Sequence, residues 1–531
     1  MGLRRMLLSL LLLAAATLPA QAASRFLVRT DHWSEADERG FGDFIAAIGN
    51  SGCDGVDSCL KSAANPFRAS DSPDAEFRAD CADLPYVLRF YYAWKRGLPF
   101  SYVSEVAPRG RARDIRYSEA GNTVERRWTV PSGAEALAVL ARLQDDISSA
   151  SYRIDPEREA PLQQDFYSPA LDPRFIRAGT VIYDPNGHLA LIFRIEPDGR
   201  IRYIDAHPDN SLTRGFYDRR FVRAAPGMGA GFKNWRPQML LGARRVDGVL
   251  FGGSVVLAPN QTLPGFSLTQ YYGTGQREDR WKAGVFRLGD VRMDYYDYIR
   301  ASLSGGRLTF EPIREITDMV ASNCADLGYR AEAVEAALEA HLQYRPQPER
   351  LPFNIYGSDG EWETYSTPSR DARLKTAFVN LRQTAERFIT MARSGDPRLL
   401  WRGGNLATAL LTAYDGAAAG CRVSYIRSDG ARITFSYEEA RARLFRLSFD
   451  PYACVEHRWG ALGAEAASCR DGAVKQAWYE AEQRLRNQIE RTYDAEMDFS
   501  LRDLQRGEGG VATPPDADTR GYLLSLLREE R

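Results

Sequence analysis

The chain has 531 residues and a formal net charge of −1, with 44% hydrophobic and 26% charged residues. This composition is typical of folded globular proteins and excludes disorder along the whole chain. The balanced charge excludes a global basic field of the kind that attracts nucleic acid. Because a single hydrophobic core stops growing at about 250–300 residues, we expect two or three domains.

The first segment has the features of a secretory signal peptide, which we place at residues 1–22. Two arginines at positions 4 and 5 precede an apolar stretch over residues 6–18, and Ala-Gln-Ala at 20–22 is a small-residue cleavage site. The apolar stretch is too short to span a bilayer, which needs about 20 residues. We therefore expect export to the periplasm or the medium, with no membrane span in the mature chain.

The next elements alternate between helix and strand. Residues 34–48 have an amphipathic pattern that stops at Gly-Asn-Ser-Gly, and residues 102–130 alternate as one or two strands. A further helix is expected over residues 132–149, with Ser132 as its N-cap.

Between these lies the most informative segment, which begins at Cys81. Residues 81–94 are apolar on nearly every side, and Arg89 is the only charge between Asp83 and Lys95, so we expect a buried helix. A cysteine at its N-terminus would face unpaired N–H groups and the positive end of the helix dipole, which lower a thiol pKa. Asp80 or Asp83 is expected to cap this helix.

An antiparallel meander follows, built from residues 179–183, a strand that starts at His188, and residues 200–206. Pro-Asp-Gly at 197–199 is a turn sequence. If the turn is centred on the Pro-Asp pair, His188 faces His207 and Asp205 is its diagonal neighbour, about 7–8 Å away at Cα and within side-chain reach. A bulge would shift this register by one residue.

The sequence pattern after residue 211 divides the rest of the chain into an irregular segment and a helical segment. Residues 212–310 are rich in glycine, arginine and aromatic residues and are expected to be irregular β-structure attached to the first domain. Further elements are expected as helices at 331–342, 373–393 and 474–497, a hairpin at 422–435, and a short terminal helix after a linker at 506–519. The predicted domains are 23–245, 246–310 as a β and loop extension, and 311–531 as a mainly helical domain.

Export makes disulfides the default state of the cysteines, and seven is an odd number. Two pairs are close in sequence, and a third is left by elimination: Cys53 with Cys59, Cys454 with Cys469, and Cys324 with Cys421. Cys81 then remains as the free thiol.

A thiol that attacks an amide needs a base within hydrogen-bond reach and a third group to orient the imidazole. We assign these roles to Cys81, His188 and Asp205, with His207 as the alternative orienter. The competing interpretations are a buried apolar cysteine, a polar strand histidine and a strand-end aspartate. Zinc bound by Cys81, His188 and His207 is a further alternative, although no paired Cys/His spacing favours it.

The order Cys, His, Asp, with the thiol on a buried helix and the base on an antiparallel sheet, resembles the papain-like superfamily over residues 75–210. Cys-Ala-Asp-Leu at 81–84 with Gly-Leu-Pro at 97–99 is similar to the transglutaminase-like branch, although Ala190 stands where that family has an aromatic residue. Gly-Thr-Val-Ile-Tyr at 179–183 with Gly-His-Leu-Ala-Leu at 187–191 is similar to NlpC-like and CHAP cell-wall amidases, although Thr180 replaces their usual Asp.

The resemblance implies an α+β fold with a papain-like core, and the sequence pattern adds a mostly helical C-terminal region. It implies an exported cysteine peptidase or amidase that hydrolyses amide bonds, with peptide or peptidoglycan as its substrate and no metal or organic cofactor. Two other functions stay open: transglutaminase-like acyl transfer or proteolysis with the same triad, and a catalytically dead binding or scaffold protein of the bacterial envelope.

Overall fold

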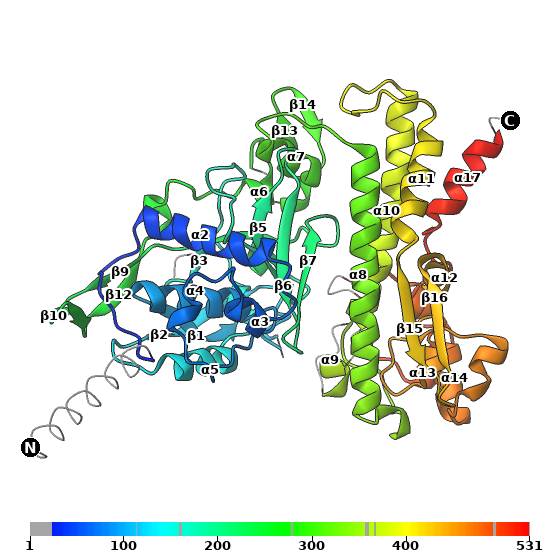
Figure 1. Cartoon of the computed structure of the whole chain (residues 1–531), viewed down its shortest axis with the longest axis horizontal. Helices are drawn as coiled ribbons and strands as arrows, with labels where there is room; N and C mark the ends of the chain where they lie inside the picture. The colour runs from blue at the N-terminus through cyan, green and yellow to red at the C-terminus, as the bar shows by residue number, and fades with distance from the viewer. Residues whose placement is uncertain are drawn as a thin grey trace, which may run out of the picture. The chain divides into compact units, whose positions relative to one another are not determined.

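The computed structural model describes residues 24–112, 114–158, 162–277, 280–355, 360–365, 368–491 and 495–529. The expected signal peptide lies outside these ranges. The chain divides into two compact units, residues 1–307 and 308–531, close to the boundary expected at 310 (Figure 1). Helices and strands are mixed, so the α+β class is confirmed. Within the described ranges, no helix combines the length and apolar character needed to cross a membrane.

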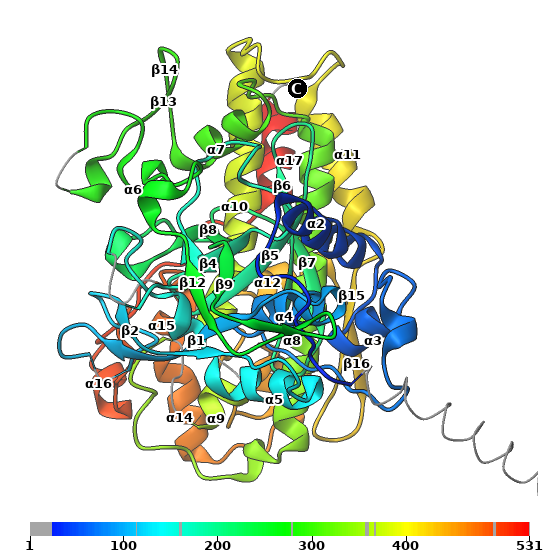
Figure 2. The same cartoon turned by 90° about the vertical axis from the view of Figure 1, so that its left-hand side faces the viewer.

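The first unit is organised around a six-stranded antiparallel sheet with the strand order β3-β8-β4-β5-β6-β7. The strands are β3 (Phe166–Tyr167), β4 (Val181–Asp184), β5 (His188–Ile195), β6 (Ile201–Ala206), β7 (Leu212–Phe216) and β8 (Gly231–Trp235). Figure 2 looks toward these strands from the side of α2 (Glu35–Asn50). The meander expected from the sequence is therefore present as β4, β5 and β6.

Both faces of this sheet are buried, which explains the nearly continuous apolar run of β5. Successive strand residues point to opposite faces. Leu189 and Leu191 join a large cluster with α2 and α4 (Leu84–Arg96), whereas Ala190 and Ile192 join a second cluster with α7 (Tyr295–Leu303). Helix α2 runs along β5 on the first of these faces (Figures 1 and 2).

Helix α4 is buried over almost its whole length, as its apolar sequence indicates. One of its buried charges, Arg89, forms two hydrogen bonds with the Glu38 carboxylate of α2, at 2.9 and 2.5 Å. The guanidinium also lies 3.3 Å from the centre of the Trp33 ring. A buried charge is tolerated only when it is paired in this way.

The sequence places Cys81 in this helix, and that prediction is wrong. Helix α4 begins at Leu84, so Cys81 lies in the preceding turn. Pro85 occupies the first turn of the helix, where its missing N–H costs no hydrogen bond. The Asp80 side chain accepts hydrogen bonds from the Ala82 and Asp83 amides and so holds the turn that precedes the helix.

The other expected elements near the N-terminus are present with shifted ends. Ser34 caps α2 through a capping box with Asp37. Strands β1 (Ser101–Pro108) and β2 (Asn122–Thr129) form a hairpin. Helix α5 spans Ala136–Asp146 and begins after Ser132, because the Ser132 hydroxyl accepts a hydrogen bond from the Val28 amide instead of capping the helix.

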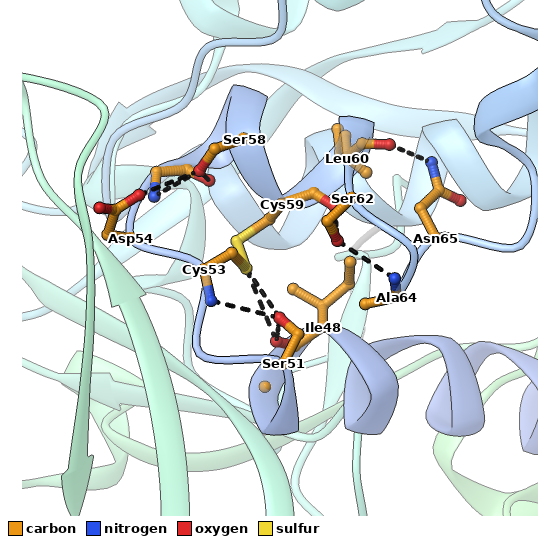
Figure 3. Close-up of a disulfide and its surroundings, with 12 residues drawn as sticks. Ile48, Ser51, Cys53, Asp54, Ser58, Cys59, Leu60, Ser62, Ala64 and Asn65 are labelled. Atoms are coloured by element: carbon orange, nitrogen blue, oxygen red, sulfur yellow. Dashed lines mark hydrogen bonds between the residues drawn. A yellow bond between two sulfur atoms is a disulfide. The ribbon is translucent and has the colours of Figure 1, made fainter.

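All three expected disulfides are present, and Cys81 is the free cysteine. Figure 3 shows the first, which joins Cys53, in the loop after α2, to Cys59 of α3 (Val56–Lys61). In the same loop, the Cys53 carbonyl accepts a hydrogen bond from Arg214 of β7 at 2.7 Å. This disulfide therefore braces the loop beside the sheet edge formed by β7. Three disulfides are compatible with an extracellular or periplasmic protein.

The segment after the sheet is irregular and belongs to the first unit, as expected. Its regular elements are β9 (Gln238–Leu241), β10 (Arg244–Val246), β11 (Val249–Phe251), β12 (Ser254–Leu257), α6 (Thr269–Tyr272), β13 (Phe286–Leu288), β14 (Val291–Met293) and α7. Tyr295, Ile299 and Leu303 of α7 cover the second face of the sheet, which explains why this segment stays with the first core.

The second unit is mainly helical, with the expected hairpin β15 (Arg422–Ile426) and β16 (Arg432–Ser436). Its helices are α8 (Pro312–Glu339), α9 (Glu361–Tyr365), α10 (Pro368–Arg393), α11 (Leu406–Ala418), α12 (Tyr437–Arg443), α13 (Val455–Arg458), α14 (Ala473–Ala481), α15 (Gln483–Asn487), α16 (Leu501–Gln505) and α17 (Thr519–Glu529). Helix α8 packs against α10 and α11, and Arg330 of α8 forms a buried ion pair with Asp371 of α10 at 2.9 Å.

The prediction of a continuous helix over residues 474–497 is wrong. This segment is divided into α14 and α15, and Gln488 is extended. At this point hydrogen bonds to distant segments replace those of a continuous helix. The Asn487 side chain donates to the Val511 and Ala512 carbonyls, and the Arg486 carbonyl accepts from the buried Lys375. Local helix propensity is therefore overridden by the packing of the C-terminal segment.

Candidate active site

The turn that carries Cys81 is held from both sides. The Asp80 amide donates to the Asp83 carboxylate at 2.6 Å, and the Asp80 carboxylate accepts from the Ala82 amide at 2.7 Å. The Tyr152 hydroxyl donates to the Ala82 carbonyl at 2.6 Å. These contacts fix the backbone on either side of the thiol.

A second brace comes from the loop after β6. The Asn210 side chain accepts a hydrogen bond from the Ala79 amide at 3.0 Å. Asn210 has a left-handed backbone with φ of 66°, a conformation that asparagine tolerates better than most residues. The backbone N–H of Asn210 in turn donates to the His207 carbonyl at 2.8 Å. The loop that follows Asp205 therefore also positions the segment that precedes Cys81.

The Cys81 sulfur lies at the start of β5. It is 3.9 Å from the Gly187 carbonyl oxygen, and the Leu189 amide acts to lower the thiol pKa. Gly187 and Leu189 flank His188, and their peptide groups point to the β5 edge that faces β6. Pairing along that edge starts further on, at Leu191 and Ile204. The sulfur thus occupies the position where β6 does not yet cover β5.

The electrostatics around Cys81 are opposite to the expectation from the helix dipole. Cys81 as a residue keeps partial exposure. Burial nevertheless raises the pKa of the Cys81 thiol, and the charges of Asp80 and Asp205 raise it further, whereas the Leu189 amide lowers it. The resting state is therefore a neutral thiol, and the prediction of a primed thiolate is wrong, because Cys81 precedes the helix and lies among carboxylates.

The Asp83 carboxyl also has a strongly raised pKa. Burial, with the nearby Asp80 charge as the second cause, raises the pKa of Asp83 to about 9. Asp83 is 4% exposed and accepts from the Asp80 amide. At neutral pH the side chain is therefore protonated, which limits the negative charge beside the thiol.

His188 and Asp205 are in direct contact. The His188 Nε2 atom lies 2.8 Å from Asp205 Oδ2. Leu191 pairs with Ile204 in the register expected for a turn at Pro197-Asp198, and a bulge between Ile192 and Arg194 shifts the pairs nearer the turn by one residue. Because the bulge lies on the turn side, the diagonal relation of His188 and Asp205 is preserved.

The Asp205 carboxylate is the centre of a longer chain of hydrogen bonds. Its Oδ1 accepts from the Thr213 hydroxyl at 2.5 Å, and the Thr213 oxygen lies 3.0 Å from His207 Nε2. A threonine hydroxyl has one proton to donate, so His207 must be the donor in the second contact. Asp205 is 3% exposed, and the order of the network is His188, Asp205, Thr213, His207.

The same count of hydrogen-bond donors and acceptors also assigns the tautomer of His188. An ionised carboxylate only accepts, so His188 Nε2 carries the proton that it shares with Asp205. In the neutral ring the lone pair is then on Nδ1, which is the atom able to take a proton from a thiol. His207 reaches the site through Thr213, and Asp205 is the group in contact with His188.

The thiol and the imidazole pack against different faces of the sheet at the start of β5. Cys81 packs against the cluster shared with α4, to which Leu189 belongs. The His188 ring lies 6.0 Å from the ring of Phe221, which belongs to the opposite cluster. The sulfur therefore contacts the Gly187 carbonyl at the strand edge, whereas the imidazole packs toward the opposite cluster.

Gly187 is required at this edge. Its φ of 82° is in the left-handed region, and a Cβ there would lie 3.3 Å from the Tyr117 hydroxyl and 3.7 Å from the Ser149 hydroxyl. A larger residue would strain the backbone that brings His188 next to Cys81.

Thr213 and Asn210 are the members of this site that the sequence analysis missed. A signal for Thr213 exists, since Pro-Asp-Asn-Ser at 208–211 is a turn sequence and an antiparallel continuation places Thr213 opposite Asp205, as observed. No local pattern indicates the contact between Asn210 and Ala79, which are separated by 131 positions.

Zinc was one alternative for Cys81, His188 and His207. Among the described residues, the donors that lie close enough together to share an ion are elsewhere: Cys454, His457, Cys469 and Asp471 in the second unit. The candidate active site therefore consists of a thiol and a histidine–carboxylate pair.

Comparison with known proteins adds no relative, because no protein-family model, no curated protein and no solved structure matches the chain.

Proposed function

We propose that this protein is an exported thiol amidohydrolase or peptidase with a papain-like core, in which Cys81 is the nucleophile, His188 the base and Asp205 the orienter. The observation that carries the proposal is the 2.8 Å contact between His188 Nε2 and Asp205 Oδ2. It is joined by a reduced thiol whose sulfur lies 3.9 Å from the Gly187 carbonyl oxygen, next to His188.

In this mechanism His188 Nδ1 takes the thiol proton while the sulfur attacks the amide carbonyl. The imidazolium then gives its proton to the leaving amine, and a thioester remains on Cys81. Water, deprotonated by His188, releases the acid and restores the thiol. Because the resting thiol is neutral, proton transfer accompanies the attack, and Sγ and Nδ1 must come within about 3–4 Å at the β5 edge.

The Cys81 amide is the candidate donor for the oxyanion. Among the hydrogen bonds of the described residues, none uses the Cys81 N–H, whereas the neighbouring Ala82 and Asp83 amides are bonded to Asp80. A backbone donor beside the nucleophile can stabilise the charge that develops on the carbonyl oxygen.

The substrate class follows from the expected location. Three disulfides accord with an oxidising compartment, and the N-terminal segment has the pattern of a signal peptide. In a bacterial envelope the abundant peptide is that of peptidoglycan, so we propose its peptide crosslinks or stems as the substrate.

The test uses the mature chain and its Cys81→Ser variant with purified peptidoglycan and its soluble stem peptides. Mass spectrometry should detect new amine and carboxylate ends with the wild type and none with the variant. Equal product from both proteins, or no product from either over a panel of envelope peptides, would contradict the proposal.

Transglutaminase-like transfer is the first alternative and uses the same thioester. Adding a labelled primary amine distinguishes it, because transfer gives a product that carries the label, whereas hydrolysis gives the free acid. The second alternative, an inactive binding or scaffold protein, is favoured by the raised pKa of Cys81.

A further inference from the structure

The second unit contains a compact group of metal-binding side chains that the proposed function does not use. Cys454, His457, Cys469 and Asp471 each offer one donor atom, and these atoms lie within 4.8 Å of one another. Their spacing is Cys-x₂-His followed by Cys-x-Asp. The two cysteines form a disulfide in this structure.

We propose that this group is a zinc site when the Cys454–Cys469 disulfide is reduced, so that one position holds either a disulfide or a metal ion. Zinc favours four sulfur, nitrogen or oxygen donors in a tetrahedron, which places donors about 3.3–3.8 Å apart. The Cys469 sulfur is 3.8 Å from His457 Nδ1, and His457 Nδ1 is 3.0 Å from Asp471 Oδ2.

The non-sulfur ligands are held in place by their surroundings. The His457 ring stacks on the Tyr479 ring, with centres 4.0 Å apart and planes at 6°. Asp471 Oδ2 also accepts from the Cys454 amide at 3.0 Å. The His457 amide lies 3.5 Å from the Cys454 sulfur. Contacts of this kind orient metal ligands and strengthen binding.

Charge and burial also suit a closed structural site. Cys454 is 3% exposed and His457 6% exposed. Zinc with two thiolates and one carboxylate has a net charge of −1, and Lys475 supplies a positive charge four residues after Asp471 in the chain. Lys475 is anchored on the Gln343 and Tyr452 carbonyls.

The conversion balances with a dithiol as reductant. Thiol–disulfide exchange transfers two electrons and two protons to Cys454 and Cys469 and leaves the reductant as its own disulfide. Zinc then binds both thiolates and releases two protons to solvent. In the oxidised form each sulfur is bonded to the other, and the tetrahedron cannot close.

The test uses the full mature chain with Cys81→Ala, so that the candidate active-site thiol takes no zinc. The protein is reduced with a phosphine, desalted, and titrated with zinc chloride, and a parallel sample stays oxidised. We expect one zinc per reduced chain with Kd below about 1 μM, and at least 100-fold weaker binding to the oxidised chain. Cobalt in place of zinc should give the spectrum of a tetrahedral thiolate complex.

Variants assign the ligands. His457→Gln and Asp471→Asn should each weaken zinc binding of the reduced chain about 10- to 100-fold. The double variant Cys324→Ser/Cys421→Ser removes a disulfide that lies outside this donor group and should keep the zinc.

Three results would overturn the proposal. They are equal zinc binding by oxidised and reduced protein, loss of zinc in the Cys324/Cys421 control, and a reduced chain that loses helical circular dichroism without recovering it on zinc addition.

Discussion

The molecule contains a cysteine beside a histidine–aspartate pair twice, once in each unit. In the first unit His188 contacts Asp205 at 2.8 Å, and Cys81 is reduced. In the second unit His457 contacts Asp471 at 3.0 Å, and the cysteine beside it is oxidised.

The two regions differ in how their residues come together. Cys454 and Asp471 are separated by 17 positions, and the local chain alone brings the group together. Cys81 and Gly187 are separated by 106 positions, and they meet through the packing of α4 against the sheet. A second cysteine is within bonding distance only in the local group. Residue types alone therefore do not distinguish a candidate nucleophile from a disulfide or metal ligand.

The largest expected effect is the loss of activity in Cys81→Ala. If the first region is catalytic, turnover should fall by about 10³-fold or more, since no nucleophile remains. The change removes only a small sulfur group, so the far-UV circular dichroism should be unchanged. His32→Gln, at an exposed position beside Asp31, is the control and should keep full activity. Persistent turnover in Cys81→Ala would place the chemistry elsewhere.

Matched carboxylate variants compare the two pairs directly. Asp205→Asn should lower kcat/KM by about 10²- to 10⁴-fold, because the imidazole loses the charge that fixes its tautomer. Asp471→Asn should leave turnover unchanged, because its partner is a histidine of the second unit. Steady-state kinetics on the same substrate measures both. Equal losses in the two variants would contradict the assignment of the active site to the first unit.

The reactivity of Cys81 with a thiol reagent should depend steeply on pH. Burial and neighbouring carboxylates raise the pKa of Cys81, so alkylation should accelerate about tenfold per pH unit between pH 7 and 9 without a plateau. Peptide mapping should find the label on Cys81 and not on the six disulfide cysteines. Asp80→Asn should speed the reaction severalfold. A plateau near pH 7 would indicate a thiolate already formed.

Thr213 offers a smaller perturbation of the same network. Thr213→Val keeps the shape but removes the hydrogen bond to Asp205 and the acceptor for His207. We expect kcat to fall about 3- to 10-fold, with a shift in the pH–rate profile, because the Asp205 carboxylate loses a donor. Thr213→Ser should restore both. A loss of stability without any change in the pH profile would make Thr213 purely structural.

Asp83→Asn should give the smallest effect, on stability. Between the unfolded pKa of 3.8 and the folded pKa of about 9, native Asp83 keeps a proton that the unfolded chain releases. Wild-type stability should therefore fall as pH rises through this window, by at most about 1.4 kcal/mol per pH unit.

The amide removes this dependence and can still accept the hydrogen bond from Asp80. We expect Asp83→Asn to be more stable than the wild type by about 1 kcal/mol or more at pH 8, with little difference at pH 4. Urea unfolding at several pH values measures the effect, and the exposed Asp145→Asn is its control. Identical pH slopes in wild type and Asp83→Asn would exclude a protonated Asp83.

The sequence by itself determined the features that depend on local pattern and on counting. Seven cysteines with two close pairs predicted the disulfide map and the free Cys81, and all of it is confirmed. Turn chemistry at residues 197–199 and alternation along β5 predicted the meander and the contact between His188 and Asp205, because strand register follows from the turn.

Only the tertiary structure decided the environment of the thiol and the path of the C-terminal segment. The start of α4 at Leu84 leaves Cys81 in a turn among carboxylates, so burial outweighs the helix dipole that the sequence suggested. The predicted helix over 474–497 is interrupted because Asn487 and the Arg486 carbonyl bond to distant segments. Solvent exclusion and long-range hydrogen bonds depend on which segments meet in space, and a local sequence pattern does not contain that information.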